Sequence, residues 1–146
     1  MAYKALDIAN KILAKASSSD SEELISNMKL QKLLYYQQGF HLAYFGTPLF
    51  GEEIEAWMYG PVVSSVYYHF KNNDNKGIEY LGETVILSDK EEALFNEVYK
   101  VYGKYSAIGL MDMSHQEMPW KSTNIGVGNI ITKDKLMTFF KKRIKK

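Results

Sequence analysis

Residues 27–45, NMKLQKLLYYQQGFHLAYF, constrain the fold more than any other segment of the chain. Their apolar side chains recur around almost the whole circumference of a helix instead of along one stripe. Such a helix is stable when other elements cover it on all sides, so we expect it at the centre of the molecule. Ser26 or Asn27 is expected to cap its start, and Gly46 to end it. Gly39, inside the helix, is expected to admit a closely packed neighbour.

Among the polar residues of this apolar helix, Gln31, Gln37 and His41 are expected to lie in apolar surroundings. A buried polar side chain without a partner costs about 1–3 kcal/mol, so we expect these residues to form internal hydrogen bonds. His41 is interpreted as a satisfied core histidine and not as a functional group.

Apolar spacing and capping residues predict further helices around the central one. These helices are predicted over residues 3–16, 62–71, 89–103, 107–117 and 133–146, with a short helical turn at 21–23. Ser88 and Glu91 have the spacing of a capping box for the helix that follows. Pro61 is expected at the first position of a helix that continues over 62–71, and Pro119 is expected to end the helix over 107–117.

Short extended runs near Ile54, Ile86 and Ile130 predict three strands of one small sheet. In the first run, strand alternation places the odd-numbered residues of 53–58 on one face and the even-numbered residues on the other. The fold class is therefore mainly α (α+β), a compact bundle of about five to six helices with a small sheet of short strands. The length of 146 residues fits a single domain over residues 1–146.

Composition excludes several classes of protein. The net charge of +1 and a single arginine, Arg143, disfavour nucleic-acid binding, because phosphate and guanine recognition favour arginine. The absence of cysteine excludes disulfides and thiolate chemistry. No apolar run reaches about 20 residues, and the charged N-terminal segment does not resemble a signal peptide, so we expect a cytoplasmic protein without a membrane span.

The sequence shows no pattern typical of a catalytic centre. His41, His69 and His115 lie on separate segments without metal-ligand spacing. Neither a nucleophile elbow nor a complete glycine-rich phosphate loop is present. We therefore expect no enzyme activity, no catalytic residue, no cofactor and no metal. The C-terminal KKRIKK is interpreted as a solvated helix end that complements the helix dipole.

Two aromatic segments are candidates for a partner-binding surface. The first, EAWMYGPVVSSVYYHF over 55–70, is expected to supply mostly core, with aromatic residues left over for a partner. The second, MSHQEMPW over 113–120, has two open interpretations: a capping and packing motif with Trp120 covering the core, or a binding site at a helix end. The candidate residues are Trp57, Tyr59, Pro61, Tyr67, Tyr68, His115, Glu117 and Trp120.

Several motifs resemble, in sequence and in order, the signature of the SocA-like family. This family is also called the Panacea antitoxin domain and is found in phage-associated GepA-like proteins. The motifs are KLQKLLYY at 29–36, QG at 38–39, GTPLF at 46–50, EIEAWMYGPVV at 53–63, YG at 102–103, SA at 106–107 and HQEMPW at 115–120. The resemblance covers about residues 25–146, and the helix over 3–16 is expected to pack on this part. Ser114 and Ser64 depart from the threonine and proline that the family often has there.

The resemblance implies an antitoxin that neutralises a cognate protein toxin, encoded by a neighbouring gene, through direct binding. It also implies that some members act as adaptors that deliver the toxin to a AAA+ protease. The alternative is a DNA-binding transcriptional regulator of phage or plasmid origin, and a hydrolase that uses His115 and Glu117 is a third hypothesis. The identity of the toxin and the oligomeric state are left open by the sequence.

Overall fold

The computed structural model describes residues 2–18, 23–73 and 76–144. Within these residues the chain forms seven α-helices, one short 3-10 helix and a three-stranded sheet, which confirms the mainly α (α+β) class. The elements are α1 (Ala5–Ser17), α2 (Asn27–Phe45), β1 (Ile54–Trp57), β2 (Gly60–Val62), α3 (Ser64–His69), η1 (Lys71–Asn73), α4 (Asp89–Tyr102), α5 (Ala107–His115), α6 (Met118–Lys121), β3 (Ile130–Ile131) and α7 (Lys133–Lys141). Of the turn predicted at 21–23, Ser21 and Glu22 lie outside the described residues.

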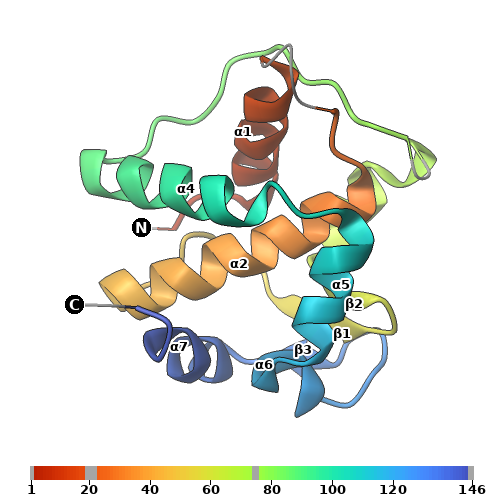
Figure 1. The fold of residues 1–146 in the computed structure, drawn as a ribbon, viewed down its shortest axis with the longest axis vertical. Helices are drawn as coiled ribbons and strands as arrows, with labels where there is room; N and C mark the ends of the chain where they lie inside the picture. Colours follow the sequence, from red (N-terminus) through yellow and green to blue (C-terminus); the bar gives the residue numbers. More distant parts are fainter. Residues whose placement is uncertain (1, 19–22, 74–75, 145–146) are drawn as a thin grey trace.

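The apolar helix α2 runs through the middle of the molecule, as predicted (Figure 1). It contacts α1, α4, α5, α7 and β2, and buried residues occur on all its sides. Ser26 caps it by accepting a hydrogen bond from the Lys29 amide, and Gly46 ends it in the left-handed conformation at φ 77°. Helix α1 packs on α2 and starts at Ala5, two residues later than predicted, because Tyr3 forms a parallel β-bridge with Phe50 and Lys4 is extended.

Gly39 allows helix α7 to approach α2 closely, as predicted. A Cβ atom at Gly39 would lie 2.2 Å from the ring of Phe140, a distance that no side chain could accommodate without a shift. Around this contact the Phe140 ring meets Tyr35 and Tyr36 edge-on, with centroids 5.5 and 5.9 Å away, and Tyr36 stacks on Tyr102 at 4.1 Å. Many of the aromatic side chains of this chain therefore belong to the core.

The polar residues of α2 are buried and hydrogen-bonded, which confirms the predicted network. The Gln31 side chain donates to Asn27 Oδ1 and accepts from the amide of Val63, each at 2.9 Å. Gln37 donates to the carbonyl of Phe95 at 3.0 Å. These bonds tie α2 to neighbouring elements, and they satisfy side chains that would otherwise destabilise the core.

His41 is the satisfied core histidine that the sequence predicts. One ring nitrogen lies 2.6 Å from the carbonyl of Thr47 and the other 2.7 Å from Glu91 Oε2. Glu91 also completes the predicted capping box with Ser88 at the start of α4. Burial opposes ionisation of Glu91, but hydrogen bonds from His41, Ser88 and Tyr3 lower its pKa to about 2.

The sheet is antiparallel with strand order β2-β1-β3. Along β1, Ile54 and Ala56 are buried while Glu55 and Trp57 are half-buried, which confirms the predicted alternation within the strand. The predicted strand near Ile86 is wrong: this side chain is 88% exposed, and residues 79–88 form no strand. Apolar β-branched residues alone do not make a strand where no neighbouring edge offers hydrogen bonds.

The third strand is β2 instead, and it contains Pro61. The prediction that Pro61 opens a helix is wrong, because Pro61 pairs with Ala56 and the helix starts only at Ser64. A proline lacks the amide hydrogen that a central strand needs, but β2 lies at the edge of the sheet, where proline is tolerated.

Pro119 does not end α5, contrary to the prediction. Helix α5 is capped by Ser106, as predicted, and ends at His115. Pro119 lies in the first turn of the separate short helix α6, where no hydrogen bond is lost. The final helix α7 follows Thr132, the predicted cap, whose side chain accepts a hydrogen bond from the Lys135 amide.

Candidate partner-binding site

Three aromatic candidates from the segment 55–70 lie together beside the sheet. Trp57 ends β1, and its ring centroid lies 5.0 Å from that of Tyr67 and 6.1 Å from that of Tyr68, both on α3. Trp57 and Tyr67 are half-buried, while Tyr68 is 54% exposed. The alternation of β1, which turns its apolar residues inward, leaves Trp57 on the outer face, where α3 partly covers it.

Glu55 holds the Trp57 indole in place. Its carboxylate accepts a hydrogen bond from Trp57 Nε1 at 2.9 Å and one from the Gly128 amide at 2.7 Å. Partial burial acts to raise the pKa of Glu55, but these two bonds, together with one from Ser64, lower it. The ionised carboxylate therefore joins β1 to the loop before β3 and fixes the orientation of the indole.

The second candidate segment meets the first through Trp120. The Trp120 Nε1–H donates to the carbonyl of Trp57 at 2.8 Å, which joins α6 to the end of β1. The His115 ring stacks on Trp120, with centroids 4.1 Å apart and planes inclined by 28°. Among the described residues, nothing forms a hydrogen bond with the buried His115 Nε2. The structure thus brings Trp57 together with Trp120 and its neighbour His115, although Trp120 follows Trp57 by 63 positions in the sequence.

Apolar side chains are exposed around the same sheet. Met58 and Tyr59, in the turn between β1 and β2, are 64% and 60% exposed. The loop before β3 is bound to β1 by hydrogen bonds from the Gly126 amide to Ala56 O and from the Ala56 amide to Asn129 O. We refer to the half-buried and exposed apolar residues of these segments as the sheet patch: Trp57, Met58, Tyr59, Tyr68, Ile125, Val127 and Ile130.

Sequence reasoning missed four members of the sheet patch: Met58, Ile125, Val127 and Ile130. For Ile125, Val127 and Ile130, the stretch NIGVGNI could have indicated an exposed loop, because its apolar residues are interspersed with glycines. Gly126 and Gly128 have φ values of 155° and 86°, so they shape a loop that an ordinary residue would strain. Apolar residues in such a loop are more exposed than the same residues in a strand or helix.

Glu117 lies beneath the surface, and its role in the fold is clear. It is 4% exposed and accepts hydrogen bonds from the hydroxyls of Tyr35, at 2.9 Å, and Tyr36, at 3.0 Å. Arg143 Nη2 lies 3.3 Å from its other oxygen. Burial raises the pKa of Glu117, although these donors partly oppose the rise. The carboxylate therefore joins α2, α6 and the C-terminal end of α7.

Pro61 is also buried, and beneath it lies a charged residue that sequence reasoning missed. Lys32, on α2, is 1% exposed, and its Nζ donates to the Pro61 carbonyl at 3.2 Å. Burial lowers the pKa of Lys32 to about 7. A Cβ atom on the preceding Gly60 would lie 2.6 Å from Lys32 Cε, and the φ of +111° at Gly60 also favours glycine. The turn between β1 and β2, which contains Met58 and Tyr59 of the sheet patch, therefore packs against Lys32.

The described residues contain no cluster of histidine, aspartate or glutamate side chains that could hold a metal ion. In the same part of the chain, no helix is both long enough and apolar enough to cross a membrane.

Comparison with known proteins identifies the family. The sequence profile of the family described as "Antitoxin SocA-like, Panacea domain" matches residues 30–121, which include most of α2, strands β1 and β2, and α6. The chain belongs to this family. It is 35% identical over 140 residues to the protein named Antitoxin SocA of Caulobacter vibrioides (strain NA1000 / CB15N), an alignment that covers 83% of this chain and 73% of that protein. No solved structure matches.

Proposed function

We propose that this chain is an antitoxin that neutralises a protein toxin, encoded by a neighbouring gene, by binding it directly through the sheet patch. Membership of the SocA-like antitoxin family supports the antitoxin role. The observation that supports the location is the exposure of Met58, Tyr59 and Tyr68 beside the half-buried Trp57. Contiguous apolar surface rimmed by polar groups is typical of protein interfaces, and tryptophan and tyrosine dominate their binding energy.

The buried candidates would act in this proposal by positioning the exposed ones. Trp120 holds the end of β1 through the Trp57 carbonyl, and Glu117 anchors the start of α6 in the core. Pro61 and Lys32 support the turn that carries Tyr59. A rigid support lowers the entropy that binding would otherwise cost, so these residues would raise affinity without contacting the toxin.

The test is a pull-down of the purified chain with the product of the adjacent open reading frame, followed by titration of the isolated complex. Tyr59→Ala and Tyr68→Ala are expected to raise the dissociation constant by about thirtyfold each, which is typical of an interface hot spot. The matched control is Tyr44→Ala, at the far end of α2. Tyr44 is 59% exposed and Tyr59 is 60% exposed, so the two truncations remove equal surface from the free protein.

Absence of a complex, with the neighbouring product harmless when expressed alone, would refute the proposal. A complex that Tyr44→Ala weakens as much as Tyr59→Ala would retain the antitoxin role but refute the assignment of the sheet patch. Binding to the chain's own promoter in a salt-sensitive band shift would instead favour the DNA-binding regulator.

Delivery of the toxin to a AAA+ protease is a further part of the proposal. An adaptor requires a complex in which the toxin and a second partner bind to different surfaces of the antitoxin. The measurement is the half-life of the toxin in cells with and without this chain. A half-life that the antitoxin leaves unchanged or lengthens, while growth is restored, would show neutralisation by binding alone.

A further inference from the structure

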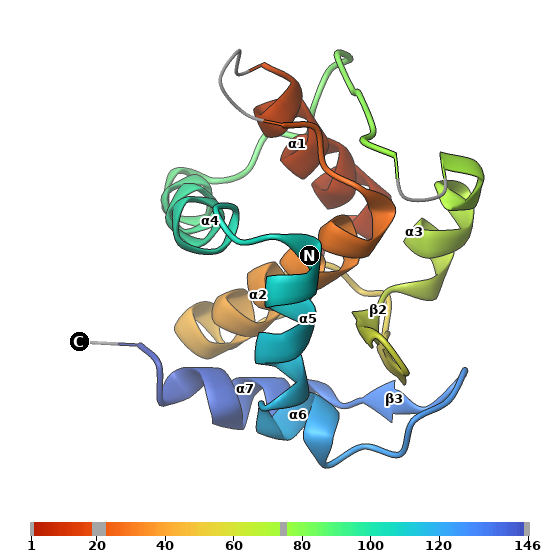
Figure 2. The ribbon, with the colours of Figure 1, turned by 45° about the vertical axis from the view of Figure 1, so that its right-hand side comes forward.

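A second feature of the surface lies at the other end of α5 from the sheet patch. Residues near four helix ends line an open pocket of about 1030 Å³ there, and these ends are the last turns of α1 and α4 and the N-terminal ends of α2 and α5. In Figure 2 the loop that leaves α4 leads into α5 beside the start of α2. His115 ends α5 beside Trp120, whereas Ser106 and Ala107 at its start line the pocket, so the nine residues of α5 separate the two sites.

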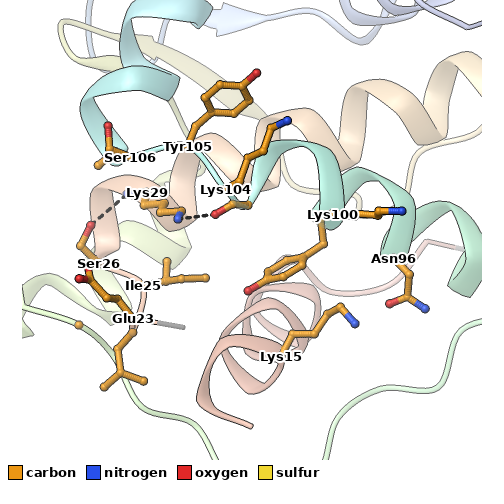
Figure 3. Close-up of a pocket in the computed structure, with 15 residues that line it drawn as sticks. Lys15, Glu23, Ile25, Ser26, Lys29, Asn96, Lys100, Lys104, Tyr105 and Ser106 are labelled. Atoms are coloured by element: carbon orange, nitrogen blue, oxygen red, sulfur yellow. Dashed lines mark hydrogen bonds between the residues drawn. The ribbon is translucent and has the colours of Figure 1, made fainter. Parts of the chain in front are cut away.

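The lining of this pocket is strongly basic. Among the described residues, Lys15, Lys29, Lys100 and Lys104 line it together with one acidic residue, Glu23, so the described lining has a formal charge of +3 (Figure 3). The whole chain has a net charge of +1. Without these five residues it contains 14 basic and 16 acidic side chains, a formal charge of −2. The described lining of this pocket is therefore basic, although the rest of the chain has a formal charge of −2.

Helix dipoles do not account for this basic lining. Lys15 and Lys100 lie in the last turns of α1 and α4, where a lysine complements the partial negative charge of a helix C-terminus. However, the N-termini of α2 and α5 carry the opposite partial charge into the same pocket, so the four helix ends offset one another. The potential of the pocket is therefore set by the ammonium groups.

Several of these ammonium groups are held in place. Lys29 Nζ donates to the carbonyl of Gly103 at 2.7 Å. Lys15 Nζ lies 5.5 Å from the centre of the Tyr99 ring, and Lys104 Nζ lies 5.4 Å from that of Tyr105. Cation–π contacts restrain a lysine side chain but leave the N–H groups on its outer side able to donate. Such restraint lowers the entropy cost of binding an anion.

We propose that this pocket is a second docking site, which binds an acidic peptide segment, rich in aspartate and glutamate, from a protein partner. Lysine ammonium groups pair with carboxylates as point charges, and the pocket is large enough for several side chains of an extended peptide. A nucleic acid fits less well, because the chain outside the lining has a formal charge of −2 and so offers no general attraction for further phosphates, and because the described lining contains no arginine. The inference does not depend on the proposed antitoxin function.

The test is fluorescence anisotropy of the full chain with a short labelled peptide of alternating glutamate and serine. The same peptide with glutamine in place of glutamate is the uncharged reference. We expect only the acidic peptide to bind, and its affinity to fall when the salt concentration is raised from about 0.05 M to about 0.3 M. Lys100→Glu/Lys104→Glu is expected to weaken binding by about tenfold or more, because both side chains are exposed at the pocket.

The control is Lys90→Glu/Lys141→Glu, which makes the same change of charge at exposed positions that do not line the pocket. It is expected to change the affinity by no more than about twofold. Circular dichroism of both double variants verifies the fold. Equal losses in the two variants, equal binding of the glutamine peptide, or no binding of the acidic peptide at low salt would overturn the proposal. Tighter binding of a single-stranded DNA of equal charge, abolished by Lys100→Glu/Lys104→Glu alone, would also overturn it and assign the pocket to nucleic acid.

Discussion

Replacement of the buried Lys32 by methionine is expected to stabilise the protein. Methionine has a similar length and fills the same space without a charge. The pKa of Lys32 is lowered from 10.5 to about 7 by burial, which corresponds to a cost of roughly 5 kcal/mol for keeping its ammonium charged in the folded state. The variant loses one hydrogen bond, to the Pro61 carbonyl, worth about 1 kcal/mol. We therefore expect a net gain of about 2–4 kcal/mol in the free energy of unfolding at pH 7.

The dependence on pH separates this charge effect from simple repacking. Between about pH 7 and pH 10.5 the unfolded chain binds a proton at Lys32 that the folded chain does not, so stability rises with pH in this window. Below about pH 7 both states are protonated, and the cost is complete. The wild-type protein should thus gain roughly 2–3 kcal/mol relative to Lys32→Met between about pH 6 and about pH 9.

The assay is urea unfolding, followed by tryptophan fluorescence, of both proteins across this pH range. Comparison of the two proteins cancels the titration of the histidines, which both contain. Lys90→Met, at an exposed position of α4, is the control and should change stability by less than about 0.5 kcal/mol. A destabilised Lys32→Met variant with the same pH profile as the wild type would refute the reasoning. It would show that Lys32 is neutralised or hydrated in a way that removes the cost of its burial.

Three further predictions test buried contacts. Gly39→Ala should destabilise the protein by about 1–3 kcal/mol in urea unfolding, because the new Cβ meets the Phe140 ring, and Phe140→Leu should recover part of this loss. Glu91→Gln should cost about 1–3 kcal/mol at pH 7, since it removes the charged partner of His41. The low pKa of Glu91 means that its contribution is complete above about pH 4.5 and is lost as the pH falls toward 2, so the difference from wild type should shrink in acid. Glu117→Ala should cost about 3–5 kcal/mol by thermal or urea unfolding, because it leaves two buried hydroxyls without an acceptor, and an equal stability of Glu117→Ala and wild type would contradict the role assigned to this carboxylate.

The sequence predicted well wherever the deciding interactions are local. The caps Ser26, Ser88, Ser106 and Thr132 are confirmed, since each one bonds to an amide three residues away in its own helix. The central place of α2 is confirmed because its apolar residues follow the period of a helix on every side. The local pattern therefore determined these four helix starts and the burial of α2.

Tertiary structure decided the sheet, since a strand exists only where another strand pairs with it. Ile86 has the side chain of a strand residue but no neighbouring edge, whereas Gly60 and Pro61 have poor strand propensity and pair with β1 nonetheless. Likewise, Pro119 begins a helix because the chain had already left α5 at His115. The pairing of β1 with β3, in contrast, joins Ile54 to Ile131 and Glu55 to Ile130, which are distant in the sequence.

The candidate functional surfaces likewise depend partly on the sequence pattern and partly on tertiary contacts. Sequence alone determined that Trp57, Tyr68 and Trp120 are available in a chain without a recognisable catalytic motif, and the motif order indicated the family that the profile match confirms. Only the tertiary structure joined Trp120 to Trp57, buried Glu117 in the core and gathered four lysines from separate segments around one pocket. Contacts between segments distant in the chain depend on how the helices pack around α2, and this packing is set by shape and burial over the whole molecule.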